Sequence, residues 1–273
     1  MHCHSCFSDG TFSPEELVDL AVSKNLKAIA LTDHNTTEGL ERFYKAAKGK
    51  IEACGGCEIT TEINGQELHL LALFLDSNKI KPLTDALKTQ LECKEKSNKQ
   101  TIENIAKDGY DVSYEEFIKN FGKGSKNRVH IAKYLVQKRI FSNIDDAFKD
   151  MLSPKGKYYK DAKKLNFYEM IKLINDVGGI SVWAHPLYHV NKETCEQIIR
   201  EAKKVGLSGV EVYYNSFSED EVAFMEKICE KYNLIASGGS DFHGENTPDR
   251  HLGIGSGDSY IPFSCYENLK NLK

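Results

Sequence analysis

The chain has 273 residues, a length that suits one large α/β domain with an insertion, or two small domains. Its hydrophobic content of 40%, charged content of 28% and formal net charge of -4 are ordinary for a globular protein and show no overall basic character typical of nucleic-acid binding. Because no apolar run approaches about 18 residues and no secretory signal opens the sequence, we expect a cytoplasmic protein without a membrane span.

The first 80 residues alternate between helical and extended patterns. Residues 13–16 read Ser-Pro-Glu-Glu, a capping box with proline at the first helical position, and this predicts the start of a helix. A second helix is predicted over residues 37–48. The Asn64-Gly65 pair is typical of a tight hairpin turn. The predicted strands of this part are residues 27–31, 56–60 and 68–74.

The character of the sequence changes between about residues 81 and 159. This segment is rich in Lys, Glu and Asn, has helical periodicity and has no convincing strand, so we interpret it as a helical insertion. Alternation resumes after it, with helices over residues 167–177, 192–205 and 219–232 and strands over 179–183, 209–214 and 234–237. Strands that alternate with helices favour a parallel sheet or barrel.

Polar residues directly follow several predicted strands. His34, His185, Asp241 and His243 each come after an apolar strand, and in a βα barrel those positions meet at the C-terminal rim. In the hairpin, a two-residue turn pairs Thr60 with His69 and therefore places Glu58 diagonally beside His69 on the same face. This pair is predicted to share a metal ion.

The set of these residues carries more weight than any member, because a single histidine is more often structural than a ligand. His2 and His4 form a His-x-His motif whose two side chains point to one face of an extended chain. Six of the nine histidines lie at strand ends or in the hairpin, beside Asp9, Glu58 and Asp241. Nine nitrogen and oxygen ligands are enough for about three divalent ions. Three carboxylates cannot neutralise such ions, so the site would attract phosphate.

Short motifs occur in the order His-Cys-His-Ser (2–5), Ser-Asp-Gly (8–10), Thr-Asp-His-Asn (32–35), Gly-Cys-Glu (56–58), Glu-Leu-His (67–69), Ala-His-Pro (184–186) and Gly-Ser-Asp-Phe-His-Gly (239–244). Together they resemble the motifs of the PHP (polymerase and histidinol phosphatase) superfamily. The resemblance implies a distorted (β/α)7 TIM-like barrel that hydrolyses phosphoesters with two or three Mn, Fe or Zn ions. Carried over residue by residue, it implies nine metal ligands: His2, His4, Asp9, His34, Glu58, His69, His185, Asp241 and His243. Six of them are also expected to act in catalysis: Asp9, His34, Glu58, His185, Asp241 and His243.

A further match lies inside the helical insertion. Residues 127–132 read Asn-Arg-Val-His-Ile-Ala and resemble a motif of one subgroup, which dephosphorylates nucleoside 3′,5′-bisphosphates or AMP or trims RNA from its 5′ end. The resemblance therefore predicts that Arg128 and His130 bind substrate; the planar guanidinium of arginine can bind two phosphate oxygens. The alternative is an ordinary pair of surface residues on a helix.

Taken together, the resemblance implies a metal-binding barrel of residues 1–80 and 160–273, with a helical cap of residues 81–159 that closes over the metal rim. We expect a phosphoesterase that acts on nucleotides or short RNA through a metal-activated hydroxide, without a protein nucleophile or a stable protein partner. Family members usually have a short apolar strand before His-x-His, whereas only Met1 precedes it here, so His2 and His4 are expected to be held by less structure than usual.

Two alternatives stay open. A histidinol-phosphate phosphatase would use the same ligands without needing Arg128 or His130. A non-catalytic binding module could instead hold zinc through the two CxxC pairs, Cys3 with Cys6 and Cys54 with Cys57. We favour the interpretation of these cysteines as free thiols in a reducing compartment.

Overall fold

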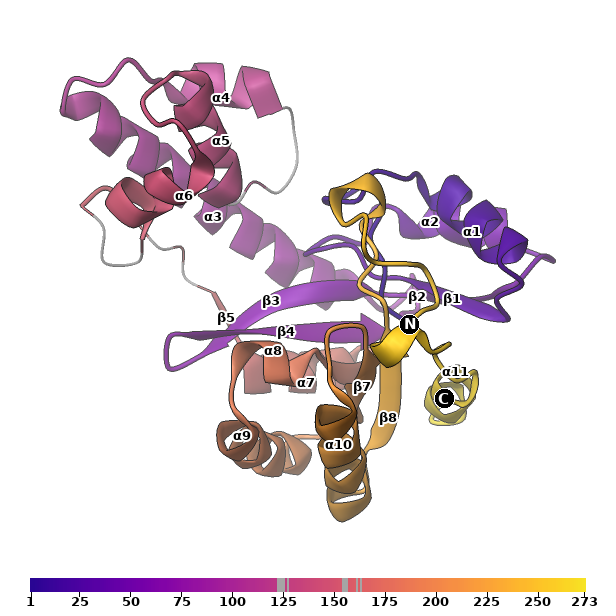
Figure 1. The fold of residues 1–273 in the computed structure, drawn as a ribbon. Coiled ribbons are helices and arrows are strands. Elements are labelled where there is room, and N and C mark those ends of the chain that lie inside the picture. Colours follow the sequence, from indigo (N-terminus) through magenta and orange to yellow (C-terminus); the bar gives the residue numbers. More distant parts are fainter. Residues whose placement is uncertain (122–125, 127, 154–156, 161, 163) are drawn as a thin grey trace. The chain divides into compact units, whose positions relative to one another are not determined.

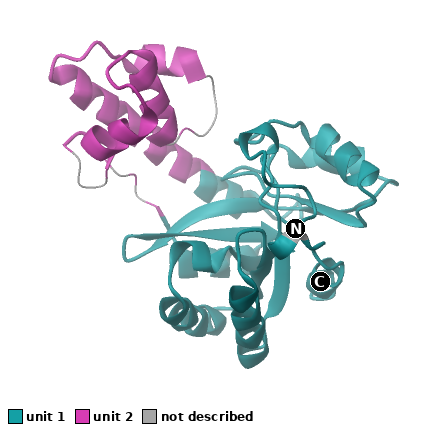
Figure 2. Cartoon of the chain, viewed as in Figure 1, with its two compact units in different colours: residues 1–87, 165–273 teal, residues 88–164 magenta. Residues whose placement is uncertain are grey.

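The computed structural model describes residues 1–121, 126, 128–153, 157–160, 162 and 164–273. They form two compact units, which Figure 2 colours separately. Unit 1 comprises residues 1–87 and 165–273, and unit 2 comprises residues 88–164. Each unit buries its own cluster of apolar side chains. Among the described residues, no helix is both long enough and apolar enough to cross a membrane.

The strands of unit 1 form two sheets, one of two parallel strands in the order β1-β2 and one of six strands in the order β5-β3-β4-β6-β7-β8 (Figure 1). The smaller sheet contains β1 (Ala28–Leu31) and β2 (Glu52–Gly55). The larger sheet contains β3 (Cys57–Ile63), β4 (Gln66–Leu73), β5 (Leu165–Asn166), β6 (Ile180–Ala184), β7 (Gly209–Tyr214) and β8 (Ile235–Gly239).

The hairpin between β3 and β4 has the register that the sequence predicts. Ile63 pairs with Gln66 and Thr60 with His69. Asn64 and Gly65 have φ angles of 51° and 81°, and a positive φ at both central residues is what a type I′ turn requires. The hairpin is antiparallel, as its predicted turn requires, but β4 also pairs with β6 in the antiparallel direction, so the six-stranded sheet is mixed and the expectation of a parallel sheet is wrong at that pairing.

The α/β class is confirmed, but the described strands do not form the closed seven-stranded barrel that the resemblance implies. The two sheets are joined instead through isolated bridges, Cys3 with Phe242 and His34 with Glu58. The Cys3 segment is held from both sides, because His4 N–H donates to the carbonyl of Phe242 and the carbonyl of Cys3 accepts from Thr32 N–H. Since this segment contributes a single bridge in place of a strand, the ring of strands stays interrupted there.

The helices of unit 1 cover these sheets. Ser13 caps α1 as predicted: its hydroxyl accepts from Glu16 N–H, and the Glu16 carboxylate accepts from Ser13 N–H. The apolar faces of α1 and α2 meet β1, whereas α7, α9 and α10 pack on the larger sheet around the fully buried Trp183. The helices of this unit are α1 (Pro14–Ser23), α2 (Leu40–Ala47), α7 (Phe167–Asp176), α8 (Pro186–His189), α9 (Lys192–Lys204), α10 (Glu219–Tyr232) and α11 (Ser264–Lys270), with 3-10 turns η2 (Gly244–Asn246) and η3 (Ser256–Asp258).

The regular elements described in unit 2 are helices, as the pattern of the insertion predicts. Their core contains Phe117, Tyr134 and Met151, all essentially without solvent exposure. The long helix α3 (Lys81–Lys107) begins in unit 1 and ends in unit 2. The other helices are α4 (Tyr114–Phe121), α5 (Arg128–Gln137), α6 (Ile144–Ala147) and the π-helix η1 (Phe148–Leu152).

Candidate metal centre

The strand ends of unit 1 bring the predicted polar residues to one place. His34 follows β1, His185 follows β6, and Asp241 and His243 follow β8. His185 and Asp241 adopt positive φ angles of 31° and 47°, a conformation that is uncommon outside glycine. Such strained backbone persists where the surrounding structure holds it, and it is concentrated at functional sites.

Glu58 lies at the centre of the cluster, and its side chain is almost completely buried. One carboxylate oxygen, Oε1, lies 2.8 Å from His69 Nδ1, as the hairpin geometry predicts. The two oxygens together lie between 2.8 and 3.3 Å from nitrogen atoms of five histidines: His2, His4, His34, His69 and His185. Glu58 is therefore the residue that connects the ligand candidates of β3 and β4 to those of the N-terminus and β6.

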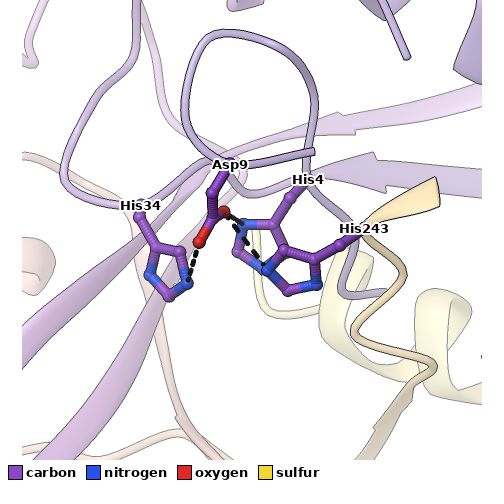
Figure 3. A group of neighbouring side chains, drawn as sticks. All are labelled: His4, Asp9, His34 and His243. Atoms are coloured by element: carbon purple, nitrogen blue, oxygen red, sulfur yellow. Dashed lines mark ion pairs between the residues drawn. The ribbon is translucent and has the colours of Figure 1, made fainter. Parts of the chain in front are cut away.

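A first group of four side chains, His4, Asp9, His34 and His243, surrounds the Asp9 carboxylate (Figure 3). The Asp9 oxygens lie 3.2 Å from His243 Nε2, 3.8 Å from His34 Nε2 and 3.9 Å from His4 Nδ1. The rings of His4 and His243 stack with their centroids 4.1 Å apart. The four ligand atoms lie within 4.8 Å of one another, close enough to share one ion.

A second group, His2, His4, Glu58 and Asp241, is entirely buried. Asp241 Oδ1 lies 3.1 Å from His4 Nε2 and 3.4 Å from His2 Nε2. The structure thus brings all nine predicted ligand positions together, in groups that overlap at His4, His34, Glu58 and His69.

Several of these atoms are buried without a hydrogen-bond partner among the described residues. They include His2 Nε2, both ring nitrogens of His4, Asp9 Oδ1 and Glu58 Oε2. A buried polar atom that stays unsatisfied costs about 1–3 kcal/mol, so the arrangement is unfavourable unless something charged lies between these atoms. Imidazole nitrogens and carboxylate oxygens are suitable ligands for Mn, Fe or Zn, and the residues therefore fit a group of divalent ions.

The charges in the cluster are strongly coupled. Burial opposes ionisation of Glu58 and Asp241, but the surrounding histidines outweigh it and hold the pKa of both carboxyls well below its ordinary value. Burial likewise opposes a charge on His69, yet Glu58 and Glu67 raise the pKa of its imidazole to about 10. Burial and the neighbouring His34 lower the pKa of His4 to about 3. Without bound cations, protonated imidazoles therefore supply the positive charge that the carboxylates need.

Two buried carboxylates that the sequence analysis did not identify hold the ligands in position. Glu211, inside β7, accepts a hydrogen bond from His185 N–H at 2.9 Å and lies 3.1 Å from His2 Nδ1. Asp33 accepts from Ser5 N–H and from the hydroxyls of Ser5 and Ser8, each at 2.7 Å. A partner such as Glu211 fixes the orientation of a metal-binding side chain, whereas Asp33 holds the loop between His4 and Asp9. A charged residue inside the apolar run of residues 209–214 is a pattern that could have revealed Glu211.

Four further side chains, Tyr188, His189, Tyr214 and Arg250, line a cavity of about 100 Å³ together with several ligand candidates. The Tyr214 hydroxyl donates to Asp241 Oδ2 at 3.0 Å, and Arg250 also contacts Asp241. His189 was missed by the sequence analysis, although it lies four residues after His185. On a helix that spacing places two imidazoles on one face, which is a recognised metal-binding arrangement.

The cysteines do not form the zinc site that the binding-module alternative requires. Cys3, Cys54 and Cys57 are buried and Cys6 is exposed. Burial raises the pKa of Cys54 to about 12, whereas the thiolate is the form that binds zinc. Among the described residues, the groups that could hold a metal contain no cysteine.

Arg128 and His130 lie in unit 2, where Arg128 begins α5. The Arg128 guanidinium lies 4.9 Å from the ring centroid of Tyr159, and the His130 ring lies 5.7 Å from that of Phe121. Asn127 of the same motif lies outside the described residues. The contact of Arg128 and His130 with substrate stays a prediction.

The chain is similar to known proteins along most of its length. The PHP domain family model matches residues 1–205. A protein of Haemophilus influenzae named 5'-3' exoribonuclease is 33% identical over 245 residues, which cover 89% of this chain and 89% of that protein. A 3',5'-nucleoside bisphosphate phosphatase of Chromobacterium violaceum is 27% identical over 256 residues, which cover 93% of this chain and 90% of that protein.

The fold is also similar to solved structures. One of them comes from Bifidobacterium adolescentis and is described as a metal-dependent phosphoesterase. It matches with a TM-score of 0.80 and 25% identity, over 98% of this chain and 93% of that one.

Proposed function

The chain belongs to the PHP domain family of metal-dependent phosphoesterases, and we propose that it hydrolyses phosphomonoesters of nucleotides. The proposed substrates are nucleoside 3′,5′-bisphosphates, AMP and the 5′ end of short RNA. The observation that carries this proposal is the network around Glu58, whose buried carboxylate lies 2.8 to 3.3 Å from imidazole nitrogens of five histidines from distant parts of the sequence. The activities for which the two relatives are named support the choice of nucleotides.

We further propose that nine residues hold two or three divalent ions of Mn, Fe or Zn. In this assignment Glu58 joins His2, His4 and Asp241 to His69 and His185, and Asp9 acts with His34 and His243. When bound, such ions lower the pKa of a bound water and neutralise phosphoryl oxygens. The carboxylates among the nine are too few to neutralise the ions, so the site attracts an anionic phosphate ester.

The residues of the chain then have to hold and orient the substrate. Phosphoryl transfer to water is mainly a matter of positioning and charge stabilisation, so it needs no protein nucleophile. The nearby hydroxyls and thiol are already engaged: Ser5 and Ser8 donate to Asp33, and the Cys3 thiol donates to the Ala30 carbonyl. Arg128 and His130 are proposed to bind a second phosphate of the substrate, which selects bisphosphates over simple esters.

Substrate assays test this function. The protein is reconstituted separately with Mn²⁺, Fe²⁺ and Zn²⁺ and assayed with 3′-phosphoadenosine 5′-phosphate, AMP, a 5′-phosphorylated oligoribonucleotide and histidinol phosphate. We expect a higher kcat/KM for one of the nucleotide substrates than for histidinol phosphate, and no turnover after treatment with chelator. Preference for histidinol phosphate would contradict the nucleotide assignment, and equal turnover in chelator would contradict metal dependence.

A further inference from the structure

Three imidazoles on one side of Glu58 form a nearly equilateral triangle. The ring centroids of His69, His185 and His189 are 5.0 Å, 5.1 Å and 5.2 Å apart, and one ring nitrogen of each lies within 4.8 Å of those of the other two. Only His69 and His185 belong to the nine residues assigned above. The position of His189 therefore needs its own explanation.

The backbone places His189 beside the other two rings. The register of β4 and β6 pairs His69 with Ala184, which brings His69 next to His185. Helix α8 begins at Pro186, directly after His185, and proline at the first helical position favours that start. His185 precedes this helix with a left-handed backbone (φ 31°), and His189 is the last residue of α8; the tight turn between them brings their ring centroids to 5.1 Å of each other.

The environment of His189 suits a ligand. Its Nε2 atom is buried and has no hydrogen-bond partner among the described residues. His69, His185 and His189 all line the cavity of about 100 Å³, as does Glu58, whose Oε1 lies 2.8 Å from His69 Nδ1 and 3.0 Å from His185 Nε2. A cavity of this size has room for an ion, because one water occupies about 30 Å³ in the liquid.

We propose that His189 is a further ligand of the ion that His69 and His185 hold, so that three imidazoles bind this ion beside the Glu58 carboxylate. The inference rests on the proposed metal centre, and it adds to the nine assigned residues a ligand that comes from α8. Three imidazoles and one carboxylate form a ligand set that suits tetrahedral Zn²⁺. An additional imidazole strengthens the hold on the ion, so chelator should remove this ion less readily than it would if only His69, His185 and Glu58 bound it.

Metal retention tests the proposal. The full-length protein and its His189→Ala and His189→Gln variants are loaded with Zn²⁺, dialysed against increasing concentrations of chelator and analysed for zinc per chain. His251→Ala is the matched control, because His251 is exposed and lies outside the cluster. We expect the wild type and His251→Ala to bind zinc at this site equally tightly. In His189→Ala the Kd of that site should rise by at least about tenfold, the lower end of what the loss of a supporting residue costs.

Substitution with Co²⁺ gives a second measurement that does not depend on turnover. The visible absorption of Co²⁺-loaded protein is intense for a four-coordinate ion and weak for five or six ligands, so His189→Ala should lose intensity that His251→Ala keeps. His189→Gln keeps a side chain of similar volume. If the alanine variant does not fold, the glutamine variant tests whether His189 binds the ion. Unchanged zinc retention and an unchanged cobalt spectrum, with a raised KM for nucleotides, would overturn the proposal and make His189 a substrate contact. The protein could also retain zinc in a way that depends on His189 and yet show no phosphoesterase activity. That result would support His189 as a ligand and would contradict the proposed function.

Discussion

The two units bury different kinds of side chain. The core of unit 2 is made of apolar and aromatic residues, and the hydroxyl of its buried Tyr134 donates to Glu116 at 2.7 Å. Unit 1 has a comparable apolar core around Trp183, but it also buries Glu58, His2 and His4 with ligand atoms that have no hydrogen-bond partner among the described residues. Among the described residues, the buried imidazole and carboxylate atoms without a hydrogen-bond partner therefore all lie in unit 1.

This difference indicates which measured property a substitution in each unit should change. Apolar burial stabilises a unit without any ligand, at roughly 25 cal/mol per Å². Buried carboxylates and imidazoles instead oppose folding unless opposite charge balances them. Changes at the centre of unit 1 should therefore alter metal content and turnover together, while a change at the substrate-binding candidates of unit 2 should alter turnover in a way that depends on the substrate.

The largest effect is expected from Glu58→Gln. The substitution keeps the volume of the side chain but removes the charge that contacts five histidines. We expect less bound metal and a fall in kcat of at least about two orders of magnitude, because both proposed metal groups that share Glu58 lose a ligand. Metal analysis and steady-state kinetics measure the two quantities.

The matched control is Glu62→Gln, four residues further along β3 and outside the candidate ligand groups of the described residues. It should keep metal and activity. Full metal content with a near-normal rate in Glu58→Gln would contradict the bridging role of this carboxylate.

A smaller and more selective effect is expected from Arg128→Ala in unit 2. Loss of a charge-assisted contact with a second phosphate should cost roughly 1.5–3 kcal/mol, or about one to two decades in kcat/KM for a nucleoside 3′,5′-bisphosphate. A simple ester such as p-nitrophenyl phosphate has no second phosphate, so its kcat/KM should change much less. Metal content should not change.

Lys133→Ala is the control for Arg128→Ala, because Lys133 is an exposed cation of the same helix, α5. An equal loss of kcat/KM with both substrates would mean that Arg128 stabilises the fold or contacts the reacting phosphate. No loss with either substrate would remove the main support for a bisphosphate substrate.

The proton balance of the centre gives a third prediction. Glu58 and Glu67 overcome the effect of burial and raise the pKa of His69 to about 10, so metal-free His69 carries a proton at neutral pH. A metal ligand must be neutral, and the proton has to leave when the ion binds. The apparent affinity for metal should thus increase with pH, by about tenfold per pH unit for each proton released, until pH approaches that pKa.

Isothermal titration of the metal-free protein in buffers with different ionisation enthalpies counts the released protons. Affinity that stays constant between about pH 6 and about pH 8 would mean that the histidines of the free protein are already neutral.

Local patterns predicted much of the fold. The capping box located the start of α1, the Asn64-Gly65 turn fixed the register of β3 and β4, and periodicity predicted α10 with its observed bounds. These features depend on residues that are close in sequence, where propensity and turn chemistry dominate. Polar residues after strands also pointed to the ligand cluster, because strand ends converge.

Long-range pairing was less predictable. The antiparallel pairing of β4 with β6 joins segments more than 100 residues apart in sequence, and no local pattern indicates its direction. The role of Glu211 depends on a contact with His2 that spans 209 positions. The role inferred for His189 depends on the left-handed backbone of His185, which starts a short helix beside the cluster. Such features follow from tertiary packing and are visible only once the chain is folded.

The smallest effect on metal binding is expected from the double variant Cys54→Ala/Cys57→Ala. Both thiols are fully buried in apolar surroundings, and the sulfur of Cys54 accepts a weak hydrogen bond from Phe74 N–H at 3.3 Å. Cys57 precedes Glu58 in β3, and successive side chains of a strand point to opposite faces, so its removal leaves the Glu58 carboxylate on the face of the metal centre.

We therefore expect unchanged zinc content and kcat/KM, with a loss of stability of about 1 kcal/mol per substitution that lowers the Tm in a thermal melt. Cys54→Ala alone is the control that distinguishes a loss of core packing from a displacement of the Glu58 side chain, because Cys54 lies in β2 and not beside the carboxylate. If both the single and the double variant lose one zinc per chain while retaining their fold, the thiols are ligands, and the assignment of the metal to histidines and carboxylates has to be revised.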